Sequence, residues 1–402
     1  MPELDYNPFD PAVRANPYPI YARLRGEAPI YRNPALGLAV VSRYEDVLAV
    51  LKSPSTFSSR AMRDLFTQGA RQVMTDASID GETLIGSDPP VHTRLRKIVN
   101  RAFTPSRIAA LEGRVRSVTD RLVSGFERRG SCDLMSDLAV PLPITLIAEI
   151  LGVDPERHRD FKRWSDDLLL AGTGQPTPKQ AERIVISDEE LGQWIDEVVE
   201  ERRARPKDDL VSALVAAESS EEVMTVEEIG NLILILLIAG NETTTNLIAN
   251  ALLALLEHPD QLEALVARPE LVPLAVEEAL RFDSPVQLTL RRATADVELP
   301  GGKLSEGEML AVLVASANRD ERHFADAARF DLARDSRGHV AFGFGTHFCV
   351  GAGLARLEAR IALEALVTRL ARIERVEKAL DYGTSLIVRG PRRLRLRFEP
   401  RA

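Results

Sequence analysis

The chain has few of the features that define several protein classes. Its 402 residues include two cysteines, Cys132 and Cys349, and no C-x-x-C pair, which argues against a disulfide scaffold or a zinc ribbon. Acidic residues outnumber basic ones, 60 to 51, and the formal net charge of −9 disfavours nucleic acid as the main partner. Hydrophobic residues make up 45% and charged residues 28%, a composition typical of soluble globular proteins.

Long apolar runs are also scarce. The stretch Met1–Pro11 is polar and proline-rich and lacks the apolar core of a signal peptide. The longest apolar run, Leu232–Ala239, is too short to cross a bilayer and is followed directly by Gly-Asn-Glu. We therefore expect a cytoplasmic protein without a membrane anchor.

Most of the chain shows the apolar periodicity of helices, and the longest such pattern covers Val226–Glu257. Gly172–Pro178 is the clearest loop. A small sheet is predicted within Leu288–Val314, with a tight turn at Pro300-Gly301-Gly302, and a hairpin turning at Gly390-Pro391 is predicted within Leu386–Phe398. The other predicted helices include Pro17–Arg25, Tyr44–Leu51, His92–Ala102, Val115–Phe126, Pro143–Leu151, Arg157–Leu170, Asp188–Arg205, Leu210–Glu218, Pro273–Phe282 and Gly351–Ala371. These patterns favour a mainly α protein with small β-sheets.

Cys349 lies in an unusual loop, Phe342–Arg356, which leads into a helix-forming run. Tight turns and close backbone approach are permitted there by Gly343, Gly345 and Gly351. Such a loop suits a thiolate metal ligand, because backbone amides and the positive end of a helix stabilise an ionised sulfur. Cys132 has no comparable surroundings and is interpreted as a small buried hydrophobic residue.

The string Phe-Gly-x-Gly-x-His-x-Cys-x-Gly-x-x-Leu-Ala-Arg resembles the haem-ligand loop of the cytochrome P-450 superfamily at every defining position. Further matching stretches lie at 88–101, 239–245, 277–291 and 318–356. The resemblance implies one triangular domain over residues 1–402, with a β-rich lobe near the N-terminus and an α-rich core. That core would bind haem b (iron protoporphyrin IX) through Cys349, and the protein would be a monomer.

The middle of the longest helical pattern, Ala239–Thr245, is polar within an apolar context. Read alone, it also fits a threonine-rich kink with a surface glutamate. It is similar to the family's oxygen-activating sequence, Ala/Gly-Gly-x-Asp/Glu-Thr, in which the small residues Ala239 and Gly240 leave room for a flat ligand. The resemblance implies that Glu242 and Thr243 deliver protons to dioxygen, the co-substrate.

Basic residues match the family's partners of the haem propionates at four positions: His92, Arg96, Arg291 and His347. His92 and Arg96 lie at i and i+4 and would share one helix face. Such donors suit a buried carboxylate, whose charge needs compensation. Arg292 is an alternative to Arg291, since a gap of one residue would exchange them. Phe342 and Gly343 are also expected at the cofactor.

The family's substrate-facing positions fall on mostly apolar residues, with Gln287 and Thr289 as candidate polar contacts. They are Leu84, Ile85, Ile235, Ile238, Val286, Gln287, Thr289, Leu386, Ile387 and Val388. An apolar residue at any of these positions is equally compatible with a place in the core. The set as a whole suits a lipophilic substrate.

Glu278 and Arg281 form a Glu-x-x-Arg, which places an acid and a base one helical turn apart. Such a pair is common in any helix. The resemblance adds Arg334 as a third member and gives the trio a structural role behind the haem.

The resemblance implies a bacterial-type monooxygenase that inserts one atom of dioxygen into a C–H bond of a fatty acid, terpenoid, steroid or polyketide. Electrons are expected from NAD(P)H through a separate reductase and a ferredoxin or flavodoxin. Docking candidates for that partner are Arg94, Lys97, Arg101 and Arg360, for which a solvated helix surface is the alternative. A peroxide-driven peroxygenase and a catalytically silent haem-binding or recruitment protein stay open, although the intact Glu242–Thr243 pair favours the monooxygenase.

Overall fold

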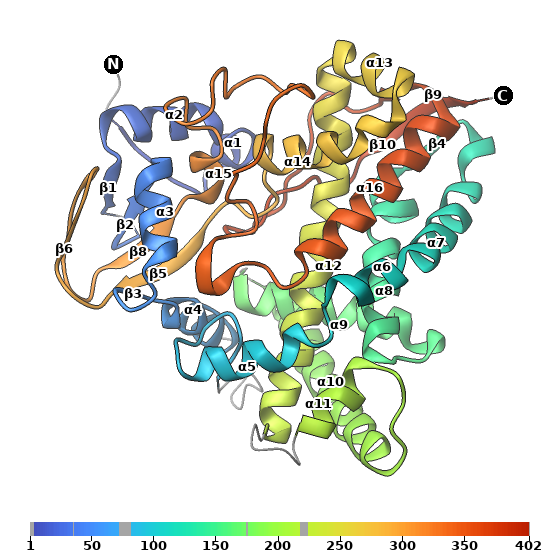
Figure 1. Ribbon diagram of the computed structural model, residues 1–402, viewed down its shortest axis with the longest axis horizontal. Coiled ribbons are helices and arrows are strands. Elements are labelled where there is room, and N and C mark those ends of the chain that lie inside the picture. The colour runs from blue at the N-terminus through green and yellow to red at the C-terminus, as the bar shows by residue number, and fades with distance from the viewer. Residues whose placement is uncertain (1–3, 35, 72–81, 174–175, 218–223, 402) are drawn as a thin grey trace. The chain divides into compact units, whose positions relative to one another are not determined.

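The computed structural model describes residues 4–34, 36–71, 82–173, 176–217 and 224–401 (Figure 1). The chain divides into two compact units. Unit 1 comprises Met1–Phe57, Ala110–Leu142 and Thr243–Ala402, and unit 2 comprises Ser58–Ala109 and Pro143–Glu242. Helices predominate and the sheets are small, which confirms the predicted fold class.

The largest sheet in the described part of the chain has the strand order β1-β2-β8-β5-β3. Its strands are β1 (Ile30–Asn33), β2 (Leu38–Val41), β8 (Met309–Val312), β5 (Thr289–Ala293) and β3 (Phe57–Ser58). The β2–β8 pair is parallel, whereas β1–β2 and β5–β8 are antiparallel. Figure 1 shows the blue N-terminal strands beside the orange ones, so segments far apart in the sequence share one sheet. Its apolar side chains pack with α3 in one core, which includes Val41, Val47, Phe57, Leu310 and Val312.

Two further small sheets lie in unit 1. The strands β6 (Val297–Leu299) and β7 (Gly302–Leu304) pair through the tight turn predicted at Pro300-Gly301-Gly302, which is confirmed. The other sheet has the order β4-β10-β9, with β4 (Ser131–Asp133), β10 (Arg395–Pro400) and β9 (Leu370–Arg375).

The hairpin predicted at Leu386–Phe398 is wrong. The strand β10 pairs with β9 and β4, and Val388 makes only an isolated bridge to Val286. At Gly390 the chain packs against α12, where an added Cβ would come within 2.7 Å of Cβ of Asn246. The glycine there serves close packing between segments, so the glycine–proline pair does not mark a hairpin turn.

The other elements of unit 1 are helical. The α-helices are α1 (Pro11–Ala15), α2 (Tyr18–Glu27), α3 (Tyr44–Lys52), α7 (Glu112–Ser124), α13 (Pro259–Ala267), α14 (Val272–Phe282), α15 (Val314–Ala317) and α16 (Ala352–Arg369). The short turns are the 3-10 helices η1 (Glu127–Arg129), η4 (Pro269–Leu271) and η5 (Gly345–His347), and the π-helix η2 (Met135–Ala139).

The regular elements in the described part of unit 2 are helices. They are α4 (Arg60–Arg71), α5 (Val91–Asn100), α6 (Pro105–Ala110), α8 (Pro141–Leu151), the 3-10 helix η3 (Pro155–Arg157), α9 (His158–Thr173), α10 (Pro178–Ala204) and α11 (Leu210–Ala217). Helix α10 starts ten residues before the predicted start, because Thr177 and Gln180 form a capping box. Residues 174–175 of the predicted loop and Glu218 of the predicted helix at Leu210 lie outside the described residues.

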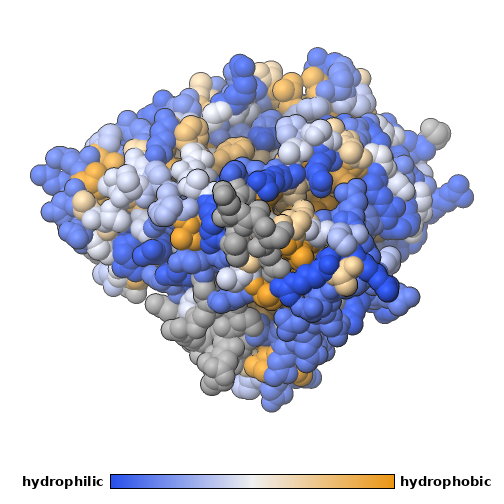
Figure 2. All heavy atoms as spheres, turned by 60° about the horizontal axis from the view of Figure 1, so that its bottom comes forward, coloured by the Kyte–Doolittle hydropathy of each residue, from blue (hydrophilic) through white to orange (hydrophobic). Residues whose placement is uncertain are grey.

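The helix α12 (Val226–Glu257) runs from unit 2 into unit 1 with the predicted bounds. By length and composition it could cross a membrane, but 67% of its most apolar window is buried inside the protein. Helices in the core of a globular protein often have the same length and apolar composition as a membrane-spanning helix. On the face drawn in Figure 2, hydrophobic side chains form separate patches within a largely hydrophilic surface.

Candidate active site

Cys349 lies in unit 1, in the loop before α16, and is half-buried. Two glycines with positive φ, Gly343 at 70° and Gly345 at 66°, turn the backbone where other residues would be strained. The Cys349 amide donates to the Phe342 carbonyl at 2.9 Å, which closes the loop. Because α16 begins at Ala352, the sulfur lies just before the positive end of that helix.

The start of this loop is held by a network around Glu277 of α14. Arg356 donates to the Glu277 carboxylate at 2.6 and 3.0 Å and stacks over the Phe342 ring, 4.5 Å from its centroid. The Ala341 amide can only donate, so Nδ1 of His339 accepts from it and Nε2 donates to Glu277 at 3.1 Å. Burial raises the pKa of Glu277, but the hydrogen bonds from His339 and Arg356 outweigh it and lower the pKa to about 2.

The structure brings Glu278, Arg281 and Arg334 together. Arg281 forms a two-bond pair with Glu278, at 2.7 and 2.8 Å, and Arg334 reaches the same carboxylate at 3.2 Å. The remaining Arg281 donors reach three backbone carbonyls, those of Asn318, Ala327 and Arg329. Glu278 and Arg281 are fully buried, and the trio therefore ties α14 to the segment before the cysteine loop.

Cys132 differs from Cys349 in its surroundings. It lies in the strand β4 and is 7% exposed. Burial, with a smaller contribution from the Asp137 carboxylate, raises the pKa of its thiol to about 12. Burial therefore disfavours the thiolate form of Cys132, the form that a metal ligand needs.

In unit 1, Arg291 and Arg292 occupy successive positions of β5, where side chains alternate between the two faces of the sheet. Arg291 is 5% exposed, and its guanidinium donates to Oγ1 of Thr289 at 3.0 Å and to the Leu290 carbonyl at 2.7 Å. Arg292 is half-buried and donates to the Gly307 carbonyl at 3.2 Å on the exposed side. His347 lies in η5, two residues before Cys349, and is half-buried.

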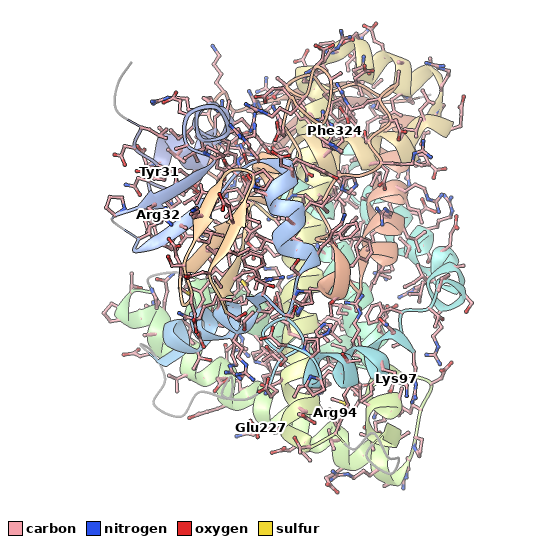
Figure 3. All side chains as sticks on the ribbon, turned by 60° about the vertical axis from the view of Figure 1, so that its left-hand side comes forward. Tyr31, Arg32, Arg94, Lys97, Glu227 and Phe324 are labelled. Atoms are coloured by element: carbon pink, nitrogen blue, oxygen red, sulfur yellow. The ribbon has the colours of Figure 1, made fainter. Side chains whose placement is uncertain are left out.

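In unit 2, His92 and Arg96 lie on α5. His92 is 1% exposed, whereas Arg96 is half-buried and donates to Oδ1 of Asn100 at 3.0 Å. On the same helix Arg94 forms a two-bond pair with Glu228 of α12, one of whose bonds measures 3.0 Å. Figure 3 labels Arg94 and Lys97 on α5, with Glu227 at the start of α12 in the same part of unit 2.

The polar middle of α12 lies within one continuous helix. Ala239 is exposed and Gly240 half-buried, although the flanking turns are mostly buried. An added Cβ at Gly240 would make only ordinary contact with the Ile147 side chain, at 3.7 Å, so packing within unit 2 does not require glycine there. Glu242 and Thr243 follow, both half-buried.

A pocket in unit 2 includes three of the predicted substrate positions, Ile85, Ile235 and Ile238. Its other described lining residues were not predicted, and they are Arg63, Phe66, Thr83, Leu168, Asn231 and Leu234. These come from α4, α9, the first part of α12 and the segment before α5. The spacing of Asn231, Ile235 and Ile238 places them on one face of α12, a signal that could have added Asn231 to the prediction. Leu84 lies between the lining residues Thr83 and Ile85 in the sequence and is half-buried, but it is not among the residues that line the pocket.

The remaining predicted substrate positions lie in unit 1. Gln287, Leu386 and Val388 line a second, small pocket, together with Tyr6, Tyr21 and Arg389. Both polar atoms of the Gln287 amide bond to protein groups: Tyr21 donates to Oε1 at 3.2 Å, and Nε2 donates to the Ser284 carbonyl at 2.7 Å. The backbone amide of Gln287 donates to the Ile387 carbonyl at 2.7 Å, and Val286 forms an isolated β-bridge with Val388. The hydroxyl of Thr289 accepts a hydrogen bond from Arg291.

Comparison with known proteins identifies the class to which this fold and loop belong. The cytochrome P450 family model matches residues 167–398. Vitamin D(3) 25-hydroxylase of Pseudonocardia autotrophica is 38% identical, with 96% of this chain and 95% of that protein covered. The structure of CYP109Q5 from Chondromyces apiculatus matches with a TM-score of 0.89 at 42% identity, covering 99% of both chains. CYP109E1 from Bacillus megaterium, solved in complex with testosterone, matches with a TM-score of 0.85 at 36% identity, covering 96% of this chain and 99% of that one.

The chain belongs to the cytochrome P450 family and is a cytochrome P450 monooxygenase. Haem and dioxygen are the cofactor and co-substrate that the family implies. The chemistry of the residues fits a haem in each unit taken by itself: unit 1 holds a half-buried cysteine before a helix N-terminus and a buried arginine, and unit 2 holds a buried histidine and an exposed alanine. A thiolate ligand and donors for carboxylates are the groups that this cofactor needs.

Proposed function

We propose that this monooxygenase inserts one atom of dioxygen into a C–H bond of a lipophilic small molecule, with haem b held through Cys349. The observation that carries the proposal is the local structure around Cys349. The hydrogen bond from the Cys349 amide to the Phe342 carbonyl closes its loop, and the loop lies directly before the N-terminus of α16. A bound haem with a thiolate ligand supplies the oxidising chemistry. Cys132 is less suited to this role, because burial raises the pKa of its thiol.

The roles of the other residues follow from their chemistry and burial. Arg291, His92, Arg96 and His347 would hold the propionates, and the burial of Arg291 favours it over the more exposed Arg292. Phe342, Gly343, Ala239 and Gly240 would lie against the flat cofactor. Glu242 and Thr243 would accept and donate protons near the bound dioxygen. The trio of Glu278, Arg281 and Arg334 would have a structural role and no part in catalysis.

A lipophilic substrate is supported by the pocket of unit 2, whose lining is mainly apolar. Among the relatives, one is named for hydroxylating vitamin D3 and another was solved with testosterone. We infer that electrons arrive from NAD(P)H through a reductase and a ferredoxin or flavodoxin, as bacterial members generally use. Of the candidate docking residues, Arg94 pairs with Glu228 and Arg360 pairs with Glu112 at 3.0 Å, so carboxylates of the chain itself already balance these two charges. The inferred location is the cytoplasm, and residues 1–402 would act as one monomeric P450 domain.

The experiment that tests this proposal replaces Cys349 with alanine. We expect the variant to lose the red-shifted carbonyl band of the reduced protein and all hydroxylation in the presence of a ferredoxin and its reductase. The matched control is Cys132→Ala, which should keep both. A thiolate-type carbonyl band that survives in the Cys349 variant would refute the ligand assignment, and hydroxylation driven by NADPH without the partners would refute the separate electron supply.

A further inference from the structure

Among the described residues that line the pocket of unit 2, Asn231 has a buried side-chain donor without a hydrogen-bond partner. Asn231 is 3% exposed, lines this pocket, and its Nδ2 makes no hydrogen bond within the described residues. Buried amide donors in folded proteins are nearly always paired, because an unpaired one loses its hydrogen bond to water without replacement. An unpaired donor in a pocket therefore points to a ligand that pairs with it.

We propose that Asn231 is a specificity-determining residue, which binds a neutral hydroxyl or keto oxygen of an elongated lipophilic substrate. The inference rests on the proposed function, because it concerns the substrate of the same enzyme. An amide N–H donates readily to either oxygen, and the rest of the wall offers mainly carbon, from Phe66, Leu168 and Leu234 among others. A pure hydrocarbon would leave the Asn231 donor unpaired, and such a substrate binds less tightly for that reason.

The charges at this pocket argue against a carboxylate at the same position. The pocket has one cationic lining residue in the described part of the chain, Arg63, and it pairs with Glu82 at 3.1 Å. Glu82 also accepts from the Ser87 hydroxyl at 2.5 Å, so it is held from two sides. A fatty acid would have to displace Glu82 from Arg63 or lie beside an acidic group. A neutral oxygen meets neither cost.

The position of Asn231 also bears on the length of the substrate. Asn231, Ile235 and Ile238 line the pocket from one face of α12, and Glu242 follows on the same helix. About three helical turns separate Asn231 from Glu242, which is about 16 Å along the helix axis. A molecule whose oxygen binds Asn231 would therefore be oxidised at a carbon far from that oxygen. The substrate class is an extended apolar skeleton with a polar atom at the end away from the reacting carbon.

Two segments that line this pocket approach each other closely. An added Cβ at Gly86 would come within 2.6 Å of Cβ of Arg63 and 2.9 Å of Oγ1 of Thr83, so glycine lets the segment before α5 pack on α4. The Gly86 amide donates to the Thr83 hydroxyl at 3.1 Å. The polar groups around Asn231 thus lie in a packed wall of unit 2.

The test compares matched ligands on the haem-loaded protein by titration calorimetry, which does not depend on a spectral change of the haem. The probes are 5α-androstan-3-one and 5α-androstane, which differ by one keto oxygen. In the unmodified protein we expect the ketone to bind about tenfold more tightly, the usual effect of one added hydrogen bond. In Asn231→Leu and in Asn231→Ala the ratio should fall to about one, whereas Ile235→Leu, a conservative change in the same wall, should keep it.

Two further measurements separate the possible outcomes. Hexadecan-1-ol should bind at least as tightly as hexadecanoic acid, and Glu82→Gln should shift this preference toward the acid. Asn231→Leu should not lower the melting temperature of the substrate-free protein, because it removes an unpaired donor. A ratio unaffected by Asn231, no binding of the ketone, a preference for the acid, or a lower melting temperature in Asn231→Leu would each overturn the inference. Loss of the thiolate-type carbonyl band tests Cys349 alone, so failure of the proposed function is recognised separately.

Discussion

Glu277 shows how single residues hold the cysteine loop. Its carboxylate accepts from His339 and Arg356, and Arg356 covers the Phe342 ring at the start of the loop. Both partners come from parts of the chain far beyond α14. The network affects the stability of the protein, because the folded state stabilises the ionised carboxylate of Glu277 and the unfolded chain does not.

We predict that Glu277→Gln destabilises the protein in a pH-dependent way. The folded-state pKa of about 2 lies below the ordinary value of 4.5. The stabilisation is therefore complete above pH 4.5 and is lost as the pH falls toward 2. The variant should lose about 1–2 kcal/mol of unfolding free energy at pH 7, after allowance for partial exposure, and less at pH 3.5. Urea unfolding of both proteins at pH 7, 5 and 3.5 measures this, and a difference that is constant over that range would contradict it.

At the scale of elements, the contact between α12 and the segment at Gly390 stabilises the middle of unit 1. Asn250 of α12 donates to the carbonyls of Asp283 and Arg389, at 3.1 and 3.0 Å, and joins three parts of the chain. Gly390 lies so close to Asn246 that a Cβ has no space without movement of the helix or the segment.

We predict that Gly390→Ala lowers the unfolding free energy by about 1–3 kcal/mol, the usual cost of adding an atom to a packed site. The control is Gly192→Ala in α10, where an added Cβ meets nothing within 4 Å. That change should stabilise the protein by up to about 1 kcal/mol, because alanine favours a helix interior. Urea unfolding compares the two variants. Equal effects would show that the close approach at Gly390 does not constrain the fold.

At the scale of the whole molecule, the cofactor should contribute to stability as well as to chemistry. A ligand that binds only the folded state stabilises it by an amount that grows with the logarithm of its affinity. A haem propionate would also compensate the guanidinium of Arg291, which is 5% exposed.

We therefore predict that the haem-free protein melts at a lower temperature than the haem-loaded one and recovers when haem is added. Arg291→Ala should reduce the gain on adding haem, whereas Arg292→Ala should leave it nearly unchanged. Differential scanning calorimetry, with haem content determined in parallel, measures both effects. The same gain in the two variants would remove Arg291 from the propionate site.

Much of the site could be predicted from the sequence because its signals are local. The glycines around Cys349, the one-turn spacing of Glu278 and Arg281, and the apolar pattern of α12 depend on residues near one another in the chain. The mainly helical fold class follows from the same periodicity and is confirmed. Resemblance extended these signals to Arg334, which local spacing alone could not link to Glu278.

The tertiary structure decided which partners these residues meet. The amide of Gln287 pairs with Tyr21 from the start of the chain, the end of the chain joins β4 and β9 in place of a local hairpin, and Asn231 stays without a described partner. Periodicity of 2 or 3.6 assigns a residue to a face, but it does not say which distant segment covers that face. The sequence by itself therefore determined the family, the helical class and the candidate ligand. Packing between distant segments determined which polar groups bond to one another within the described residues, and at Asn231 it leaves a buried donor that we assign to the substrate.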